Sequence, residues 1–135
     1  MLIDAGPIVA LLDDREADHA ACVAVVAAAP DDPMITTWSC FTEASHLLHR
    51  KAGTRGQSRL WVMWKTGKLE FHNLTADEID RSADLMAQYD DLPMDLADAT
   101  LVATAETLGI RQHFTLDSHF RAYRLADGGG FEVVP

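Results

Sequence analysis

The chain begins Met1-Leu2-Ile3-Asp4-Ala5-Gly6-Pro7, and this stretch decides the fold. Its three apolar residues predict a short buried strand, and Gly6 and Pro7 turn the chain into a helix. Asp4 then lies at the carboxyl end of the strand, at the edge of an open α/β sheet where ligands gather. A single aspartate in this position could equally cap the helix that follows.

Three later acids, Glu43, Asp98 and Asp117, fall at similar junctions and outweigh the capping interpretation. We expect Glu43 in the first turn of a helix capped by Ser39 or Thr42. Asp98 stands among small apolar residues, where a solvated charge is not expected, and Asp117 directly follows a predicted strand. Carboxylates at the ends of separate elements can hold Mg²⁺ or Mn²⁺, which prefer oxygen ligands. The four acids therefore predict a site for one or two divalent cations.

Asp95 lies three residues before Asp98, so both side chains can face the same direction on one helix. Asp95 is nearer the start of that helix and could simply cap it. Two metal ions ~4 Å apart can activate water and stabilise the leaving oxygen in phosphodiester hydrolysis. No histidine base is then required.

Strands alternate with helices along the chain. The predicted strands cover 1–3, 34–37, 69–71, 112–116 and 131–134, and the predicted helices cover 7–12, 17–29, 39–53, 55–65, 75–89 and 95–108. The helix over 75–89 opens with a capping-box variant at Thr75 and Glu78. Its predicted inward residues are Ile79, Ala83, Leu85 and Met86. This alternation favours a mainly parallel sheet with helices on both faces.

Length and composition indicate one globular domain over residues 1–135, with 48% hydrophobic residues. The two cysteines, Cys22 and Cys40, match no metal spacing and are too few for a disulfide framework. No signal peptide is visible, because Asp4 interrupts the N-terminus before an apolar run develops. We therefore expect a cytoplasmic protein without a membrane span.

The formal net charge of -10 counts against a general DNA-coating role, because nucleic-acid binders are usually basic. The cations are unevenly placed, since the segment 50–68 holds six of them and no acid. Trp61 and Trp64 lie in this segment, which suggests a contact surface for RNA, a second subunit or another protein. Equally, one tryptophan could belong to the core and the other be exposed without a role. The candidate RNA-contacting cations are Arg50, Lys51, Arg55, Arg59, Arg121 and Arg124.

Four stretches of the sequence together resemble the PIN-domain family, and within it the VapC-type ribonuclease toxins of bacterial toxin–antitoxin pairs. The stretches carry the four acids in order and reach residue 120; they are 2–7, 42–44, 96–105 and 114–120. The resemblance implies a PIN-like three-layer α/β/α sandwich with a short central sheet. Asp95 lies where the family often has an uncharged residue, so the resemblance assigns it no catalytic role.

The resemblance also implies an activity and partners. It implies a Mg²⁺-dependent endoribonuclease, with Mn²⁺ able to substitute, in which Asp4, Glu43, Asp98 and Asp117 bind metal and carry catalysis. It implies a homodimer and a small VapB-like antitoxin that fits a segment over the acidic site, with an arginine among the carboxylates. The alternative is a non-catalytic PIN-like scaffold that binds RNA or a protein, although a degenerate scaffold is expected to have lost some of the acids.

Overall fold

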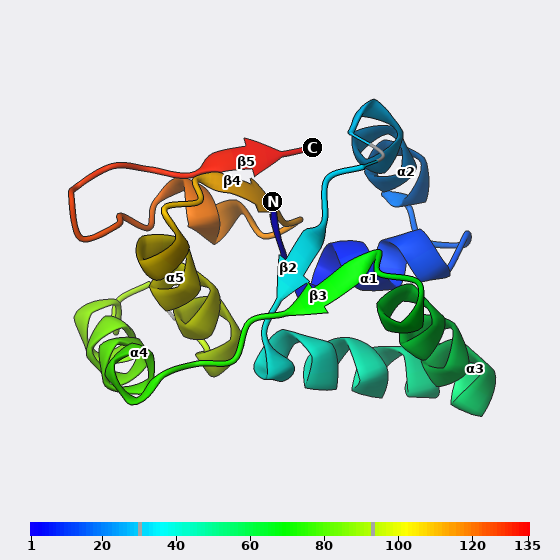
Figure 1. Cartoon of the computed structure of the whole chain (residues 1–135), viewed down its shortest axis with the longest axis horizontal. Helices are drawn as coiled ribbons and strands as arrows, with labels where there is room; N and C mark the ends of the chain where they lie inside the picture. Colours follow the sequence, from blue (N-terminus) through cyan, green and yellow to red (C-terminus); the bar gives the residue numbers. More distant parts are fainter. Residues whose placement is uncertain (30, 93) are drawn as a thin grey trace.

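Five short strands form one parallel sheet at the centre of the molecule, as the computed structural model shows (Figure 1). The structure describes residues 1–29, 31–92 and 94–135. Pro30, predicted to end the helix over 17–29, and Pro93, predicted to separate the helices over 75–89 and 95–108, lie outside the described residues. The elements in chain order are β1 (Leu2–Ile3), α1 (Ala5–Leu12), α2 (His19–Ala28), β2 (Met34–Thr36), α3 (Trp38–Lys65), β3 (Leu69–Phe71), α4 (Ala76–Gln88), α5 (Leu96–Leu108), β4 (Gln112–Phe114), the 3₁₀ turn η1 (Ser118–Arg121) and β5 (Glu132–Val134).

The sheet has the strand order β3-β2-β1-β4-β5, and every described pairing is parallel. The shortest strand, β1, lies in the middle, with Leu2 opposite Ile35 on β2 and opposite His113 on β4. The order reverses at β1, because the chain first builds outward through β2 and β3 and then returns to the other side. Such a reversal opens a crevice at the carboxyl ends of the strands.

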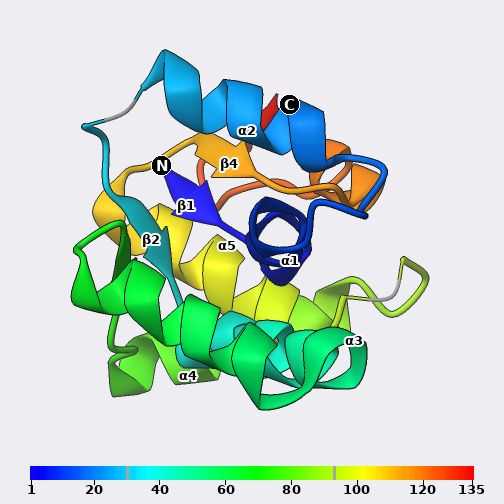
Figure 2. The same cartoon turned by 90° about the vertical axis from the view of Figure 1, so that its right-hand side faces the viewer.

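Helices cover both faces of the sheet, which confirms the predicted three-layer α/β/α sandwich. Successive strand residues point to opposite faces. Leu2 packs with α5, whereas Ile3 packs with α1 and α3. The same alternation on β4 directs His113 against Phe120 and Phe114 toward α1. Figures 1 and 2 show α4 and α5 on one side of the sheet and α1 and α3 on the other.

Helix α3 turns back on itself at Gly53, where the prediction ended one helix. Gly53 has φ 60° and ψ -149°, a conformation that favours glycine and interrupts the helical geometry. The two halves then pack so closely that a Cβ on Gly56 would lie 2.7 Å from the backbone oxygen of Leu48. The returning half therefore brings the residues around 61–64 back beside the start of the helix, where Phe41 contacts Trp61.

The prediction of the inward face of α4 was wrong for three of its four residues. Leu85 is buried, but Ile79, Ala83 and Met86 are exposed. The face that packs on α5 instead contains Glu78 and Ser82, which are polar. Glu78 is held by the predicted capping box with Thr75, and the Ser82 hydroxyl donates to the Glu78 backbone oxygen at 2.7 Å. The buried side of this helix therefore combines apolar Leu85 with hydrogen-bonded polar residues, which apolar periodicity alone did not predict.

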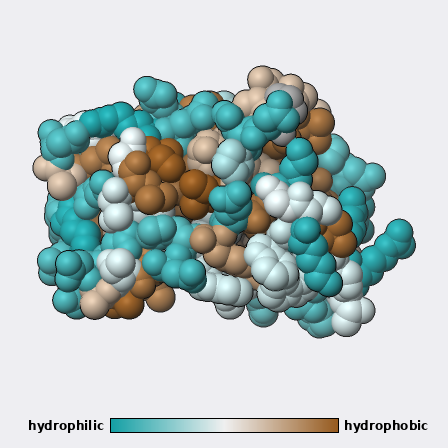
Figure 3. Space-filling model, in the orientation of Figure 1, coloured by the Kyte–Doolittle hydropathy of each residue, from teal (hydrophilic) through white to brown (hydrophobic). Residues whose placement is uncertain are grey.

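Other boundaries differ by a few residues. Helix α1 begins at Ala5, because the Asp4 side chain caps it before Pro7. Helix α3 begins at Trp38, directly after Thr37, so Glu43 lies in its second turn and not its first. Strand β4 ends at Phe114, so Asp117 follows it after two intervening residues rather than at once. The surface in Figure 3 mixes hydrophilic and hydrophobic areas, and no helix among the described residues is long and apolar enough to cross a membrane.

Candidate active site

Asp4 and Asp117 are joined through one hydroxyl group at the carboxyl end of the sheet. The Thr115 hydroxyl donates to Asp4 Oδ2 at 2.9 Å and accepts the backbone N–H of Asp117 at 3.0 Å. The other oxygen of Asp4 accepts the Ala5 N–H at 2.6 Å, so the buried carboxylate has a fixed orientation. Thr115 therefore sets the position of one acid and the path of the chain that carries another.

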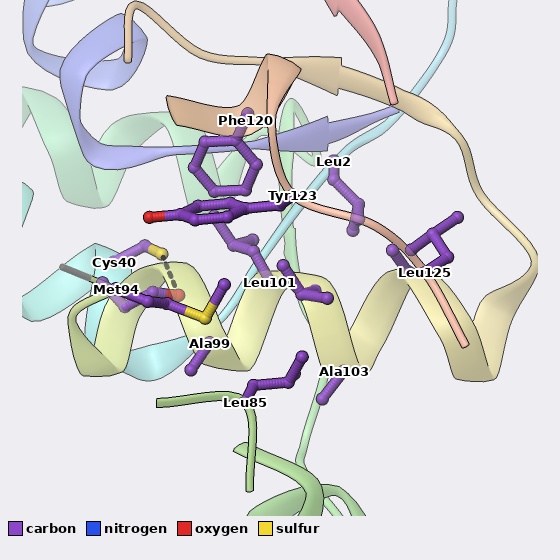
Figure 4. Packing of buried hydrophobic residues seen from close by; sticks show 13 residues of the cluster. Leu2, Cys40, Leu85, Met94, Ala99, Leu101, Ala103, Phe120, Tyr123 and Leu125 are labelled. Atoms are coloured by element: carbon purple, nitrogen blue, oxygen red, sulfur yellow. Dashed lines mark hydrogen bonds between the residues drawn. The ribbon is translucent and has the colours of Figure 1, made fainter. Parts of the chain in front are cut away.

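Asp98 comes from the other side of the sheet, in the first turn of α5. Asp95 caps this helix by accepting the Asp98 N–H at 2.9 Å, which is the capping role that the sequence left open. Tyr123 lies across α5 with its hydroxyl toward the N-terminal end of the helix (Figure 4) and donates to Asp98 Oδ2 at 3.4 Å. Asp98 is only 8% exposed.

Glu43 is exposed on α3 and borders a hollow of about 770 Å³ that also reaches the start of α5. Asp95 lies on the opposite wall of this hollow, and Trp38 and Leu96 form part of its lining. The same Trp38 and Leu96 also line a second hollow of about 420 Å³ that extends toward α4. Glu43 and Asp95 therefore stand beside an open, partly aromatic groove.

The four predicted acids act on one another electrostatically, which places them in one neighbourhood. Burial, and then the charges of Asp95 and Asp4, raise the pKa of Asp98 to about 8; Asp117 acts in the same direction. Burial also raises the pKa of Asp4, against hydrogen bonds from Thr115 and Ala5 that lower it. Partial burial raises the pKa of Glu43, and the charge of Asp4 adds to this effect. Asp4 and Asp95 thus each act on the pKa of both Glu43 and Asp98.

The donor set suits a hard divalent cation. Among the residues that the structure describes, no three histidine, cysteine, aspartate or glutamate side chains are gathered tightly enough to form a complete ligand set. Mg²⁺ does not need one, because it usually keeps several waters and takes only one or two protein carboxylates. The mutual repulsion that raises these pKa values is also what a bound cation would relieve. The residues present fit Mg²⁺ or Mn²⁺ better than a closed zinc site.

The predicted RNA-contacting cations do not line the hollow beside Glu43, where the described lining has no arginine or lysine. Lys51 pairs with Glu16, and Arg124 donates to backbone oxygens of its own turn at 2.8–2.9 Å. Arg55 and Arg59 border a separate hollow near the end of α1. Arg50 and Arg121 are exposed.

Sequence reasoning missed the roles of Thr115 and Tyr123. Thr115 lies two residues before Asp117, a spacing that allows its hydroxyl to accept the Asp117 N–H, so a local signal was present. Tyr123 lies 25 residues from Asp98 and had no such signal. His113, which was placed correctly in a strand, is fully buried against Phe120, and burial lowers its pKa to about 3. It therefore stays neutral and belongs to the core.

A parallel sheet between two helix layers, with acids gathered at the strand ends, defines an α/β protein whose site lies at a topological switch point. The profile of the PIN domain matches residues 1–125. The chain is 30% identical over 136 residues to ribonuclease VapC26 of Mycobacterium tuberculosis, and the match covers 100% of both proteins. The chain therefore belongs to the PIN-domain family, in its VapC-type branch.

Two solved structures share the fold. The crystal structure of Mycobacterium tuberculosis VapC20, described as a toxin that cleaves the sarcin–ricin loop, matches with a TM-score of 0.85 and 22% identity, covering 99% of this chain and 98% of that one. A chain of VapBC2 from Rickettsia felis, solved on a DNA fragment from its promoter, matches with a TM-score of 0.72 and 12% identity, again over 99% and 98%. At these identities the two likenesses concern the fold alone.

Proposed function

We propose that this chain is a Mg²⁺- or Mn²⁺-dependent endoribonuclease and the toxin of a type II toxin–antitoxin pair. The observation that carries the proposal is the electrostatic coupling of Asp4, Asp98 and Asp117, with Glu43 coupled to Asp4. A protein gains no stability from holding like charges together, so such a cluster points to a ligand. The relative named as a ribonuclease spans the whole chain, which supports RNA as the substrate.

The proposed reaction is the hydrolysis of an RNA phosphodiester bond, and three of the four acids have distinct parts in it. A divalent cation bound there would supply Lewis-acid stabilisation and lower the pKa of the attacking water. Asp4 offers a carboxylate that Thr115 already holds in place. Asp98 must give up a proton before it can act as a ligand, because its pKa is raised to about 8. Glu43, the most exposed of the four, borders the groove where the substrate would enter.

The proposal includes partners. The chain's net charge of -10 and its acidic site suit an antitoxin segment that carries an arginine into the carboxylates. A neighbour solved as a VapBC complex supports a protein partner of this kind. We also propose a homodimer that works in the cytoplasm.

The test is cleavage of total cellular RNA by the purified chain in Mg²⁺, in Mn²⁺ and in EDTA. We expect cleavage with either ion and none in EDTA, and mapping of the new ends would identify the target. Asp98→Asn keeps the shape of the side chain but removes the ligand charge. The matched control is Asp80→Asn, which changes an exposed aspartate of α4.

The control should cleave like the wild type, and Asp98→Asn should lose cleavage. Full metal-dependent cleavage by Asp98→Asn would remove Asp98 from the proposed site. Absence of cleavage by the wild type under every metal condition, with intact binding of RNA or a protein, would favour the non-catalytic scaffold.

A further inference from the structure

All three tryptophans of the chain gather with two phenylalanines into one continuous surface, which we call the aromatic strip. Its members are Trp38, Phe41, Trp61, Trp64 and Phe71. Neighbouring ring centroids lie 3.9–6.4 Å apart, from the stacked Trp38–Phe71 pair to the tilted Trp64–Phe71 pair. The strip joins the start of α3, its returning half and the edge strand β3.

The strip combines one buried ring with three exposed rings. Phe41 is 3% exposed and contacts Trp38, Trp61 and Phe71 edge-on. The three tryptophans by contrast are 50%, 39% and 44% exposed in chain order. Three large rings with 39–50% exposure are more than is needed to cover Phe41. The exposed faces of the tryptophans are therefore available to a ligand.

Trp38 is held rigidly. Its indole lies nearly parallel to Phe71, at an interplanar angle of 10°, and its Nε1–H donates to Asn73 Oδ1 at 3.3 Å. A ring that is already fixed loses little conformational entropy when a flat ligand stacks on it. The same Trp38 lines the hollow that contains Glu43, so the strip is continuous with the carboxylate site.

An exposed cation beside the strip suits an anionic ligand. The returning half of α3 lies within the acid-free segment 50–68, but Lys51 pairs with Glu16, and Arg55 and Arg59 border the hollow near the end of α1. Lys65 is exposed, four residues after Trp61 on the same helical face. Glu70 lies between Leu69 and Phe71 on β3, but alternate strand residues project to opposite faces, so its carboxylate is directed away from Phe71.

We propose that the aromatic strip is a stacking surface for the bases of single-stranded RNA, which it leads to the carboxylate site. This inference rests on the proposed ribonuclease function. Proteins bind single strands by stacking bases on aromatic rings and placing cations near the phosphates. The strip has both features, and its end at Trp38 adjoins the acids. A peptide could use the rings, but exposed Lys65 beside them and the adjoining hollow with Glu43 favour RNA.

Because all three tryptophans lie in the strip, intrinsic tryptophan fluorescence reports directly on ligand binding there. The metal-free protein is titrated in EDTA with a twelve-nucleotide adenosine RNA and with a twelve-unit ribose-phosphate chain that lacks bases. The first should quench the tryptophan fluorescence. The second has the same phosphates but nothing to stack, so it should bind more weakly and leave the fluorescence nearly unchanged.

Substitutions of Trp64 test whether the binding of RNA depends on stacking at the strip. Trp64→Ala should weaken binding of the adenosine RNA by about 5- to 30-fold, the lower part of the range for loss of one base–aromatic stack. It should leave binding of the base-free chain unchanged. Trp64→Phe retains a ring and should restore most of the affinity. Val23→Ala is the matched control, because Val23 is 43% exposed on α2, away from the strip. Circular dichroism checks that each variant is folded.

Unchanged affinity of folded Trp64→Ala for the adenosine RNA would overturn the strip as an RNA surface, even if Mg²⁺-dependent cleavage persists and the proposed function stands. Equal losses for the adenosine RNA and the base-free chain would also overturn it, because stacking would not be the cause. Weakened binding of the antitoxin alone would assign the surface to a protein. Failure of the wild type to cleave RNA, with Trp64-dependent binding intact, would instead overturn the nuclease and retain the strip.

Discussion

Glu78 and Asp98 occupy the same position in two neighbouring helices, yet their carboxyl groups behave in opposite ways. Each is the third residue after the N-cap, Thr75 in α4 and Asp95 in α5. Both side chains belong to buried residues, with 4% and 8% of the surface exposed. The pKa of Glu78 is lowered to about 2, whereas that of Asp98 is raised to about 8.

The hydrogen-bond partners and neighbouring charges of the two carboxyl groups explain why their pKa values move in opposite directions. Burial alone would raise the pKa of Glu78, but hydrogen bonds outweigh it: the Thr75 N–H donates at 2.7 Å, and His72 and Thr107 contribute as well. Asp98 receives the Tyr123 hydroxyl at 3.4 Å and otherwise faces the charges of other acids. A carboxylate that accepts several hydrogen bonds is stabilised as an anion, and one that faces like charges is not.

The comparison separates an acid that serves the fold from an acid that serves the site. Glu78 closes a capping box and supports the contact between α4 and α5. Asp98 is buried at a cost to the free energy of folding, which is expected where a group is kept for a ligand. The predictions below test whether the two acids can be separated in this way.

The largest expected effect is on catalysis. Asp98→Asn should lower the rate of Mg²⁺-dependent RNA cleavage by at least about 1,000-fold, because it removes charge that acts on the metal and the reacting phosphate. Glu78→Gln should stay within about threefold of the wild type when rates are corrected for the folded fraction. Single-turnover cleavage of a labelled RNA measures the rates of both variants. Equal losses of rate would show that Asp98 and Glu78 do not differ in their importance for catalysis.

The pH dependence of stability should have opposite signs for the two acids. The pKa of Asp98 is raised from 3.8 to about 8, so the folded state binds its proton more tightly than the unfolded state, and the stability that this proton contributes is lost as pH rises between these values. In EDTA, Asp98→Asn should therefore gain stability over the wild type as pH rises from 5 to 8, by up to about 1.4 kcal/mol per pH unit. Urea unfolding at four pH values measures the difference; a constant difference would contradict the raised pKa.

Glu78 should follow the reverse course. Its pKa is lowered from 4.5 to about 2, so its contribution is fully present above pH 4.5 and is lost as pH falls toward 2. Glu78→Gln should cost about 1.5–3 kcal/mol at pH 7, the range for hydrogen bonds to a charged group. The cost should shrink in acid, with Asp80→Asn as a control that stays near the wild type. A cost that is the same at pH 3 and pH 7 would show that charge is not its source.

Much of this comparison could be predicted from the sequence. The order of the four acids, the capping box at Thr75 and Glu78, and the end of α5 at Gly109 are local patterns, and the structure has the capping box and the left-handed Gly109 in place. The parallel sheet followed from the alternation of strands and helices. These features depend on residues close together in the chain.

The errors and omissions depend on contacts between distant residues. The inward face of α4 was predicted wrongly, because its packing against α5 buries Glu78, which is hydrogen-bonded to Thr107 of that helix. The aromatic strip joins residues from 38 to 71 through the reversal at Gly53, which pattern alone could not place. The raised pKa of Asp98 likewise depends on its burial in the fold and on Asp4 and Asp117, which are distant from it in the sequence.

The smallest effect is expected at Tyr123. Tyr123→Phe removes the hydroxyl that donates to Asp98 at 3.4 Å but keeps the ring packed against Phe120 and Tyr89. Because this hydrogen bond is long, stability should change by less than about 1 kcal/mol and cleavage by less than about threefold. Chemical denaturation and the cleavage assay measure the two. A loss as large as that of Asp98→Asn would make Tyr123 a main determinant of the site.

The central claim is that the carboxylates form a divalent-cation site, and melting curves test it most directly. The wild type, Asp98→Asn and Glu78→Gln are compared in EDTA, Mg²⁺, Mn²⁺ and Na⁺ at matched ionic strength. At 100 times its dissociation constant, a cation that binds only the folded state adds about 2.7 kcal/mol, or roughly 10 °C in Tm for a chain of this length. The wild type and Glu78→Gln should show this rise with Mg²⁺ and Mn²⁺, and Asp98→Asn should melt higher than the wild type in EDTA and gain less. Equal shifts with Na⁺ and Mg²⁺ would mean general screening of the -10 net charge, and would contradict the metal site.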